Sequence, residues 1–302
     1  MYERREKVNN VISGVLVVDK PVGMTSHEVV QVIRRGTNIR RAGHTGTLDP
    51  RASGVLVILV GPAVRLSEYV SASDKRYQAI IRLGSKTDTY DSDGQVTDTA
   101  PVNVTMEQFG EALKKFVGEI EQTPPPYSAV RVQGRHAYEK AREGEEVDLK
   151  PRIINVYSLD ILEWNPPEVT VDVHCSSGTY VRSLAYDLGE VLGCGAMLSG
   201  LRRTKSGRFS LKDAVPLRKL VESFETQTWY QYVIPAAEAL AEWTALTLSN
   251  EQVEAIRHGH RIPGEGKEGE IVRGITEQGE LVALLEFDPL TKEYQPRKVF
   301  FA

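Results

Sequence analysis

The 302-residue chain is poor in cysteine and has no long apolar run. Its two cysteines, Cys175 and Cys194, could form one bridge at most and lack the spacing of a zinc site. We expect both to be buried thiols, because free cysteine usually packs as a small hydrophobe. The longest strongly apolar run, residues 55–60, is too short to cross a bilayer, and the first twenty residues lack an apolar signal core. We therefore expect a cytoplasmic protein with no membrane partner.

Motifs of three common enzyme classes are also missing. Gly43 and Gly46 lack the spacing and the lysine-serine pair of a Walker loop, and no Gly-x-Ser-x-Gly elbow occurs. Of six histidines only His258 and His260 lie close together, without a carboxylate or thiolate at ligand spacing. The sequence therefore does not indicate a P-loop hydrolase, a serine hydrolase or a metal site.

Positive charge is concentrated in two segments, although the net charge of the chain is −4. Residues 31–51 hold five arginines and a single acid, Asp49, while residues 201–208 hold four cations and no acid. Much of the balancing negative charge lies in the last third of the chain. This segregation favours an anionic partner that binds on one side of the protein.

Asp49 is the acid that the sequence marks most clearly. It lies between Leu48 and Pro50 in a glycine-rich loop, and the proline disfavours a helical conformation at the aspartate. An Asp-Pro pair is also common in simple turns, so a turn aspartate is one interpretation. The other is a catalytic carboxylate that the neighbouring arginines keep ionised. The number of arginines, and the lack of another nucleophile, favour the second.

Hydrophobic periodicity predicts a mixture of strands and helices. Strands are expected at 14–18, 55–60, 75–83, 156–161 and 169–175, the last two joined by a turn at 165–167. Helices are expected at 26–35, after the Thr105–Gln108 capping box, and at 179–192. Residues 124–151 are polar and rich in arginine, which predicts a long loop with a short helix. Beyond residue 235, a second capping box at Ser249 and Gln252 and regularly placed glycines predict a small β-rich domain.

Four motifs occur in the order found in the TruB family of pseudouridine synthases, which the chain resembles from Gly14 onward. They are LVVDKP (16–21), GHTGTLDP (43–50), KRY (75–77) and GTYVRSL (178–184). The resemblance implies an α+β catalytic fold, with a central, largely antiparallel sheet flanked by helices and a small PUA-like domain. The expected boundaries are an N-terminal extension at 1–13, a catalytic domain at 14–235 containing an RNA-gripping insertion at 124–151, and the PUA-like domain at 236–302.

The resemblance also implies a reaction. A uridine at position 55, in the T arm of tRNA, would become pseudouridine without a cofactor or a metal. The N1–C1′ bond breaks, the flipped uracil turns, and C5 joins C1′. Asp49 matches the catalytic carboxylate, which could attack C1′ or C6 or deprotonate C2′ to give a glycal. Arg182 matches the arginine that pairs with it.

Further site residues follow from the same resemblance. Tyr77 matches a residue that stacks on the base and can accept a proton, and Tyr180 matches one that orders the pocket. Leu201 matches an apolar wall of the uracil site. Lys20 is expected to support the active-site loop, and His44 to fill the stack that the flipped base leaves. From the residues alone, a core tyrosine is the favoured interpretation of Tyr77, and a turn histidine is an equally good interpretation of His44. An exposed surface lysine is the alternative for Lys20.

Contacts with the RNA backbone are expected in two places. Arg131, Arg135 and Arg142 lie in the insertion, where neighbouring acids leave a solvated loop as the alternative. Arg202 and Arg203 are expected to bind phosphate because no acid competes nearby in the sequence. The C-terminal domain would hold the acceptor end of tRNA, and we expect a monomer that needs no guide RNA. Two other functions stay open: a tRNA-folding chaperone, and a glycosylase that releases free uracil.

Overall fold

A large mixed sheet organises most of the chain in the computed structural model, which describes residues 12–300 except 129 and 146. The expected N-terminal extension lies almost entirely outside the described residues. The strand order is β14-β1-β3-β12-β4-β11-β10-β7, with β2, β13 and β15 paired beside it. Only the β1–β14 and β3–β12 pairings are parallel among these strands, so the predicted largely antiparallel sheet is confirmed. The strands are β1 (Gly14–Lys20), β2 (Ala42–His44), β3 (Ser53–Val60), β4 (Lys75–Leu83), β7 (Gly118–Gln122), β10 (Arg152–Asn165), β11 (Glu168–Cys175), β12 (Ala196–Ser206), β13 (Phe209–Ser210), β14 (Val215–Pro216) and β15 (Ile234–Pro235).

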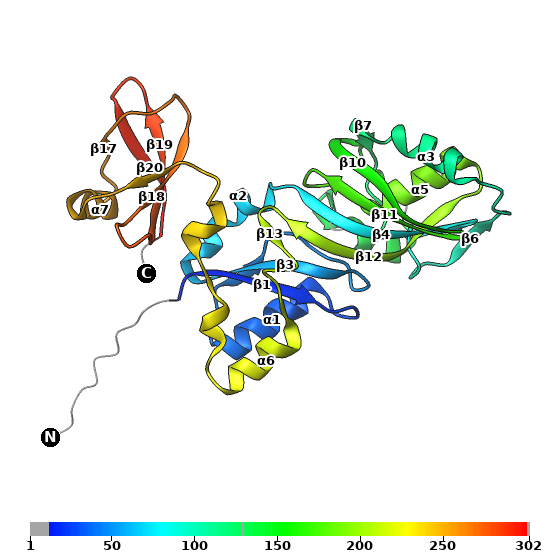
Figure 1. Cartoon of the computed structure of the whole chain (residues 1–302), viewed down its shortest axis with the longest axis horizontal. Helices are drawn as coiled ribbons and strands as arrows, with labels where there is room; N and C mark the ends of the chain where they lie inside the picture. Colours follow the sequence, from blue (N-terminus) through cyan, green and yellow to red (C-terminus); the bar gives the residue numbers. More distant parts are fainter. Residues whose placement is uncertain (1–11, 129, 146, 301–302) are drawn as a thin grey trace.

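Helices cover the two halves of this sheet (Figure 1). α1 and α6 pack beside β1, whereas α3 and α5 pack against β10–β12. The capping boxes that begin α1 at Thr25 and α3 at Thr105 are both formed. The helices are α1 (Ser26–Thr37), α2 (Ser67–Ser71), α3 (Met106–Lys114), α4 (Ala137–Arg142), α5 (Val181–Leu192) and α6 (Leu217–Glu225), with 3-10 helices η1 (Gly61–Leu66), η2 (Trp229–Tyr232) and η3 (Ala236–Leu240).

Strands also form in segments for which the periodicity predicts none. Residues 201–206 of the basic segment belong to β12, which joins the β1–β3 half of the sheet to the β4–β11 half. The insertion contains the expected short helix α4 and a hairpin of β8 (Arg131–Val132) and β9 (Arg135–His136). A second hairpin pairs β5 (Ser85–Thr87) with β6 (Val96–Thr99). Cys175 and Cys194 are buried free thiols, as predicted.

A separate five-stranded sheet, in the order β16-β18-β19-β20-β17, forms the C-terminal region with α7 (Figure 1). The predicted β-rich character and the second capping box, at Ser249, are confirmed. The exact boundary after residue 235 stays a prediction. These elements are β16 (Ala245–Thr247), α7 (Asn250–Arg257), β17 (Ile262–Pro263), β18 (Ile271–Ile275), β19 (Leu281–Asp288) and β20 (Glu293–Val299). No helix of the described chain is long and apolar enough to cross a membrane.

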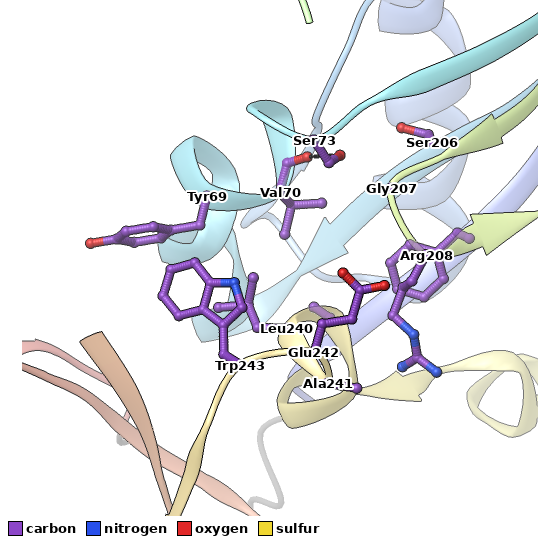
Figure 2. Close-up of a pocket in the computed structure, with 12 residues that line it drawn as sticks. Tyr69, Val70, Ser73, Ser206, Gly207, Arg208, Leu240, Ala241, Glu242 and Trp243 are labelled. Atoms are coloured by element: carbon purple, nitrogen blue, oxygen red, sulfur yellow. Dashed lines mark hydrogen bonds between the residues drawn. The ribbon is translucent and has the colours of Figure 1, made fainter. Parts of the chain in front are cut away.

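Polar and aromatic contacts join the C-terminal sheet to the rest of the chain. Arg273 on β18 donates to the carbonyl oxygens of Ala237, Ala241 and Trp243 at 2.8–3.1 Å, so it fixes the connecting segment. Figure 2 shows the pocket at this junction, where the Tyr69 ring of α2 meets Trp243 edge to face at 5.3 Å. These contacts give the C-terminal region a defined position beside the large sheet.

We predict that Gly54→Ala destabilises the protein by about 3 kcal/mol, because two costs coincide at this residue. Gly54 has φ +99°, and a Cβ there would lie 2.2 Å from the backbone oxygen of Arg203 on β12. The measurement is the urea-induced unfolding free energy. Gly43→Ala is the matched control, since Gly43 lacks a positive φ and its Cβ would meet no described atom within 4 Å. Equal stability of the two variants would contradict the prediction.

Candidate active site

Asp49 lies in the connection between β2 and β3, and the residues around it are firmly held. The Ser26 hydroxyl, at the start of α1, accepts from the Leu48 amide at 2.8 Å and donates to the Leu48 carbonyl at 3.0 Å. On the other side, the Pro50 carbonyl accepts from the Gly23 amide at 2.8 Å and from Lys20 Nζ at 3.3 Å. The carboxylate therefore projects from a turn that β1 and α1 hold in place.

Lys20 has the position expected of a support for this loop. It is fully buried, and its ammonium also donates to the carbonyls of Pro21 and Met24. Burial lowers its pKa to about 8, although the nearby Asp49 charge opposes that shift. The geometry does not match the alternative of an exposed surface lysine.

Arg182, in the first turn of α5, contacts Asp49 directly. Its Nε lies 3.1 Å from a carboxylate oxygen of Asp49, and only 8% of the arginine side chain is exposed. The same guanidinium lies 3.3 Å from the Asp91 carboxylate. It also donates to the Thr89 carbonyl at 3.3 Å and to the Tyr127 carbonyl at 3.0 Å. A planar arginine fork can meet several acceptors at once, so one side chain joins three segments around Asp49.

Asp91 is a site residue that the sequence did not single out. It lies in the turn after β5, where its carboxylate accepts from the Thr89 hydroxyl at 2.6 Å and from the Asp93 amide at 3.0 Å. The only signal available was a run of acids and threonines ending in glycine at 87–94. Such a run is equally typical of an exposed turn.

The prediction that neighbouring arginines keep Asp49 ionised is wrong. Residues distant in the sequence determine its charge state. The facing charges are Arg182, Asp91, Lys20 and Asp93. Although 43% of the Asp49 side chain is exposed, Asp49 lines a cleft and is closely surrounded by protein atoms. This loss of water raises the pKa of Asp49, and Asp91 raises it further, while Arg182 opposes both.

The cleft beside Asp49 has an apolar wall. Its lining includes Ala52, Leu198 and Leu201, together with Arg182 and Asp91. Leu201, on β12, therefore lines the same cleft as Asp49, and its role as a wall of the uracil site stays a prediction. Tyr77 lies on the neighbouring strand β4, buried with 8% exposure. Burial raises the pKa of Tyr77, and the Arg203 guanidinium opposes this shift by charge and hydrogen bonding.

Arg203 is not a phosphate contact, and that prediction is wrong. The side chain is only 2% exposed and points into the protein from β12. Its guanidinium donates to the carbonyls of Val55, Gly46 and Thr47 at 2.7, 3.0 and 3.4 Å. Arg203 therefore supports the loop that carries Asp49 from both sides.

Arg202 points the other way and is partly exposed. It forms an ion pair with Asp19 at 2.8 Å, so an acid does compete for it, contrary to the expectation from the local sequence. Its role as a phosphate contact stays a prediction. In the insertion, Arg131 is exposed, whereas Arg135 pairs with Glu143 and Glu145 and Arg142 lies over the Tyr138 ring at 5.6 Å.

His44 and Tyr180 are placed by different elements. His44 is on β2, where burial and the Arg203 charge lower the pKa of the imidazole and favour its neutral form. Its buried Nδ1 has no hydrogen-bond partner among the described residues. Tyr180 precedes α5, with its amide and carbonyl bonded to Gln122 at 2.8 and 3.0 Å and its ring 5.5 Å from the Arg152 guanidinium. No cluster suited to a metal ion occurs in the part of the chain that is described.

Two family models cover this arrangement. Residues 34–181 match the model described as "TruB family pseudouridylate synthase (N terminal domain)", and residues 182–241 match "tRNA pseudouridylate synthase B C-terminal domain". The first contains Asp49, Tyr77 and Asp91, and the second begins at Arg182.

Curated relatives and solved structures agree with these matches. The "tRNA pseudouridine synthase B" of Syntrophotalea carbinolica is 43% identical over 249 residues, which are 82% of this chain and 81% of that protein. The protein of the same name from Thiobacillus denitrificans is 42% identical over 275 residues, 91% of this chain and 92% of its own. A chain in the "Crystal Structure of a Cbf5-Nop10-Gar1 Complex" has a TM-score of 0.75 and 30% identity, covering 95% of this chain and 85% of that one.

We predict that Asp91→Asn lowers the pKa of Asp49. The asparagine removes a negative charge that disfavours ionisation of Asp49 and leaves Arg182 with a single facing carboxylate. The measurement is a carbon-13 NMR titration of the Asp49 carboxyl. In Asp98→Asn, an exposed control on β6, the pKa of Asp49 should stay at its wild-type value. An unchanged or raised pKa in Asp91→Asn would contradict this account.

Proposed function

The chain belongs to the TruB family of pseudouridylate synthases, and we propose that it acts on the uridine at position 55 of tRNA, with Asp49 as the catalytic carboxylate. It is a tRNA pseudouridine synthase, since relatives of that name match it at more than 40% identity over most of their length. The main support for Asp49 as the catalytic carboxylate is its ion pair with Arg182, beside a cleft that Leu201 lines.

The reaction requires an ionised and fixed carboxylate on each of its three possible routes. Attack on C1′ or C6 uses the carboxylate as a nucleophile, and formation of a glycal uses it as a base. Burial disfavours the ionised form of Asp49, whereas the Arg182 charge favours it. We propose that Arg182 orients the carboxylate and keeps it ionised at neutral pH. The N1–C1′ bond is exchanged for a C5–C1′ bond, N1 gains a proton, and the C5 hydrogen leaves as a proton.

Tyr77 and Leu201 are proposed to hold the uracil while it turns. Both lie at the sheet centre, on the neighbouring strands β4 and β12. Tyr77 could accept the C5 proton only as its phenolate, which would thereby become the neutral phenol. Burial disfavours that phenolate, whereas the adjacent Arg203 guanidinium favours it. Tyr180, held through its backbone by Gln122, would order the entrance to the same pocket.

Base flipping is proposed to expose the uridine. Extruding a stacked base costs a few kcal/mol, and stacking on an aromatic ring recovers about 1–3 kcal/mol per base. His44 supports this step because a neutral, planar imidazole can take the place of the base.

We further propose that the tRNA T arm occupies the cleft, that the C-terminal sheet holds the acceptor end, and that the protein acts as a cytoplasmic monomer. We also propose that it acts without a guide RNA. Identities above 40% to proteins named tRNA pseudouridine synthase B, against 30% to the chain in the Cbf5 complex, support this.

The two alternative functions are less well supported. The relatives are named for catalysis, which does not favour a role limited to RNA folding. A glycosylase would use the same carboxylate but would release uracil, so the products separate it from an isomerase.

We predict that Asp49→Asn abolishes pseudouridine formation and retains tRNA binding, because the amide keeps the shape of the side chain and removes its charge. The substrate is tRNA carrying tritium at uracil C5. Wild type should release tritium to water without free uracil, and the variant should release neither.

Asp160→Asn, an exposed change on β10, should match wild type in this assay. Turnover by Asp49→Asn would contradict the assignment of the carboxylate, and free uracil from wild type would favour the glycosylase.

A further inference from the structure

Tyr90 has a backbone conformation that a bulky side chain rarely adopts. Its φ is +65°, in the left-handed region, within the turn between β5 and β6. A positive φ costs conformational free energy for an aromatic residue, so it persists only where the surrounding structure stabilises it. An interaction specific to the Tyr90 side chain is therefore expected.

The Tyr90 ring stacks on the Tyr186 ring of α5. The centroids are 3.9 Å apart and the planes differ by 19°. Lys86, on β5, lies 6.0 Å from the Tyr186 ring and forms an ion pair with Glu190 of the same helix at 2.7 Å. The turn and the helix are thus joined through an aromatic pair and a neighbouring ion pair.

Tyr186 follows Arg182 by four residues and lies one turn further along the same helix face. The residues on either side of Tyr90 provide two of the partners of Arg182, namely the Thr89 carbonyl and the Asp91 carboxylate, each at 3.3 Å. The stack and the arginine contacts therefore connect the same turn to the same helix.

The backbone of Tyr90 is also tied to the cleft wall. Its carbonyl accepts from the Leu198 amide at 3.0 Å, and the Ser92 amide donates to the Leu198 carbonyl at 3.1 Å. If Tyr90 relaxed to a negative φ, the flanking carbonyl and carboxylate would move relative to Arg182. The catalytic pair would then lose two contacts that fix the guanidinium.

We propose that Tyr90 and Tyr186 are positioning residues, whose stacked rings hold the 87–94 turn so that Asp91 and Thr89 keep Arg182 aligned with Asp49. This inference rests on the proposed role of Asp49 and assigns two residues outside the cleft to the same reaction. Neither tyrosine is proposed to touch the substrate.

The test compares kcat, tRNA affinity and thermal unfolding in four variants. We expect Tyr186→Ala to reduce kcat for tritium release by about 10- to 100-fold, because small displacements of catalytic groups have effects of this size. Affinity for tRNA and thermal unfolding should remain near wild type. Tyr186→Phe keeps the stacked ring and should restore kcat. Tyr90→Gly accepts the positive φ without a ring, so it should lower kcat even where Tyr186→Ala folds poorly.

The matched control is Tyr157→Ala, which removes a ring that contacts His174 at 4.8 Å on β10 and β11. It should retain the kcat of wild type. Wild-type kcat in folded Tyr186→Ala or in Tyr90→Gly would overturn the proposal, as would a fall in tRNA affinity that accounts for the whole loss. Activity of Asp49→Asn in the same assay would instead reject the proposed function, so the two failures are distinguishable.

Discussion

The site depends on the ion pair between Asp49 and the nearly buried Arg182 guanidinium, which also contacts three further acceptor residues. A buried charge is costly unless every donor has a partner, so this arginine fixes whatever surrounds it. It connects the β2–β3 loop, the turn at 87–94 and the start of the insertion to helix α5. The geometry of Asp49 is therefore a property of four segments that are distant in the sequence.

Two further buried cations stabilise the loops that flank this pair. Lys20 donates to carbonyls of the β1–α1 and β2–β3 loops, and Arg203 donates to carbonyls on both sides of Asp49. Neither forms an ion pair with a carboxylate among the described contacts. Backbone carbonyls satisfy their hydrogen bonds, while Asp49 stays available to the cleft. Positive charge here serves to shape the loop as well as to act on the aspartate.

Sequence patterns predicted the features that depend on neighbouring residues, such as helix caps and single strands. The capping boxes at Thr105 and Ser249 and the alternating strand 75–83 all form. The Asp49–Arg182 contact came only from the family resemblance, because spacing alone cannot bring such distant residues together. The prediction that Arg203 contacts phosphate is wrong because the local sequence shows which charges are near. It does not show which face of a strand a side chain occupies. On β12, Arg202 is in register with outward-facing Gln78 and Arg203 with buried Tyr77.

We propose that a single arginine fork orients Asp49 as the catalytic carboxylate. Arg182→Lys tests it most directly, since lysine keeps the positive charge but cannot meet the same acceptors in one plane. The measurement is the single-turnover rate of tritium release from C5-labelled tRNA, with tRNA binding measured alongside. We expect a rate lower by about 100-fold or more, with tRNA affinity retained. A lysine variant that reacts at the wild-type rate would contradict it.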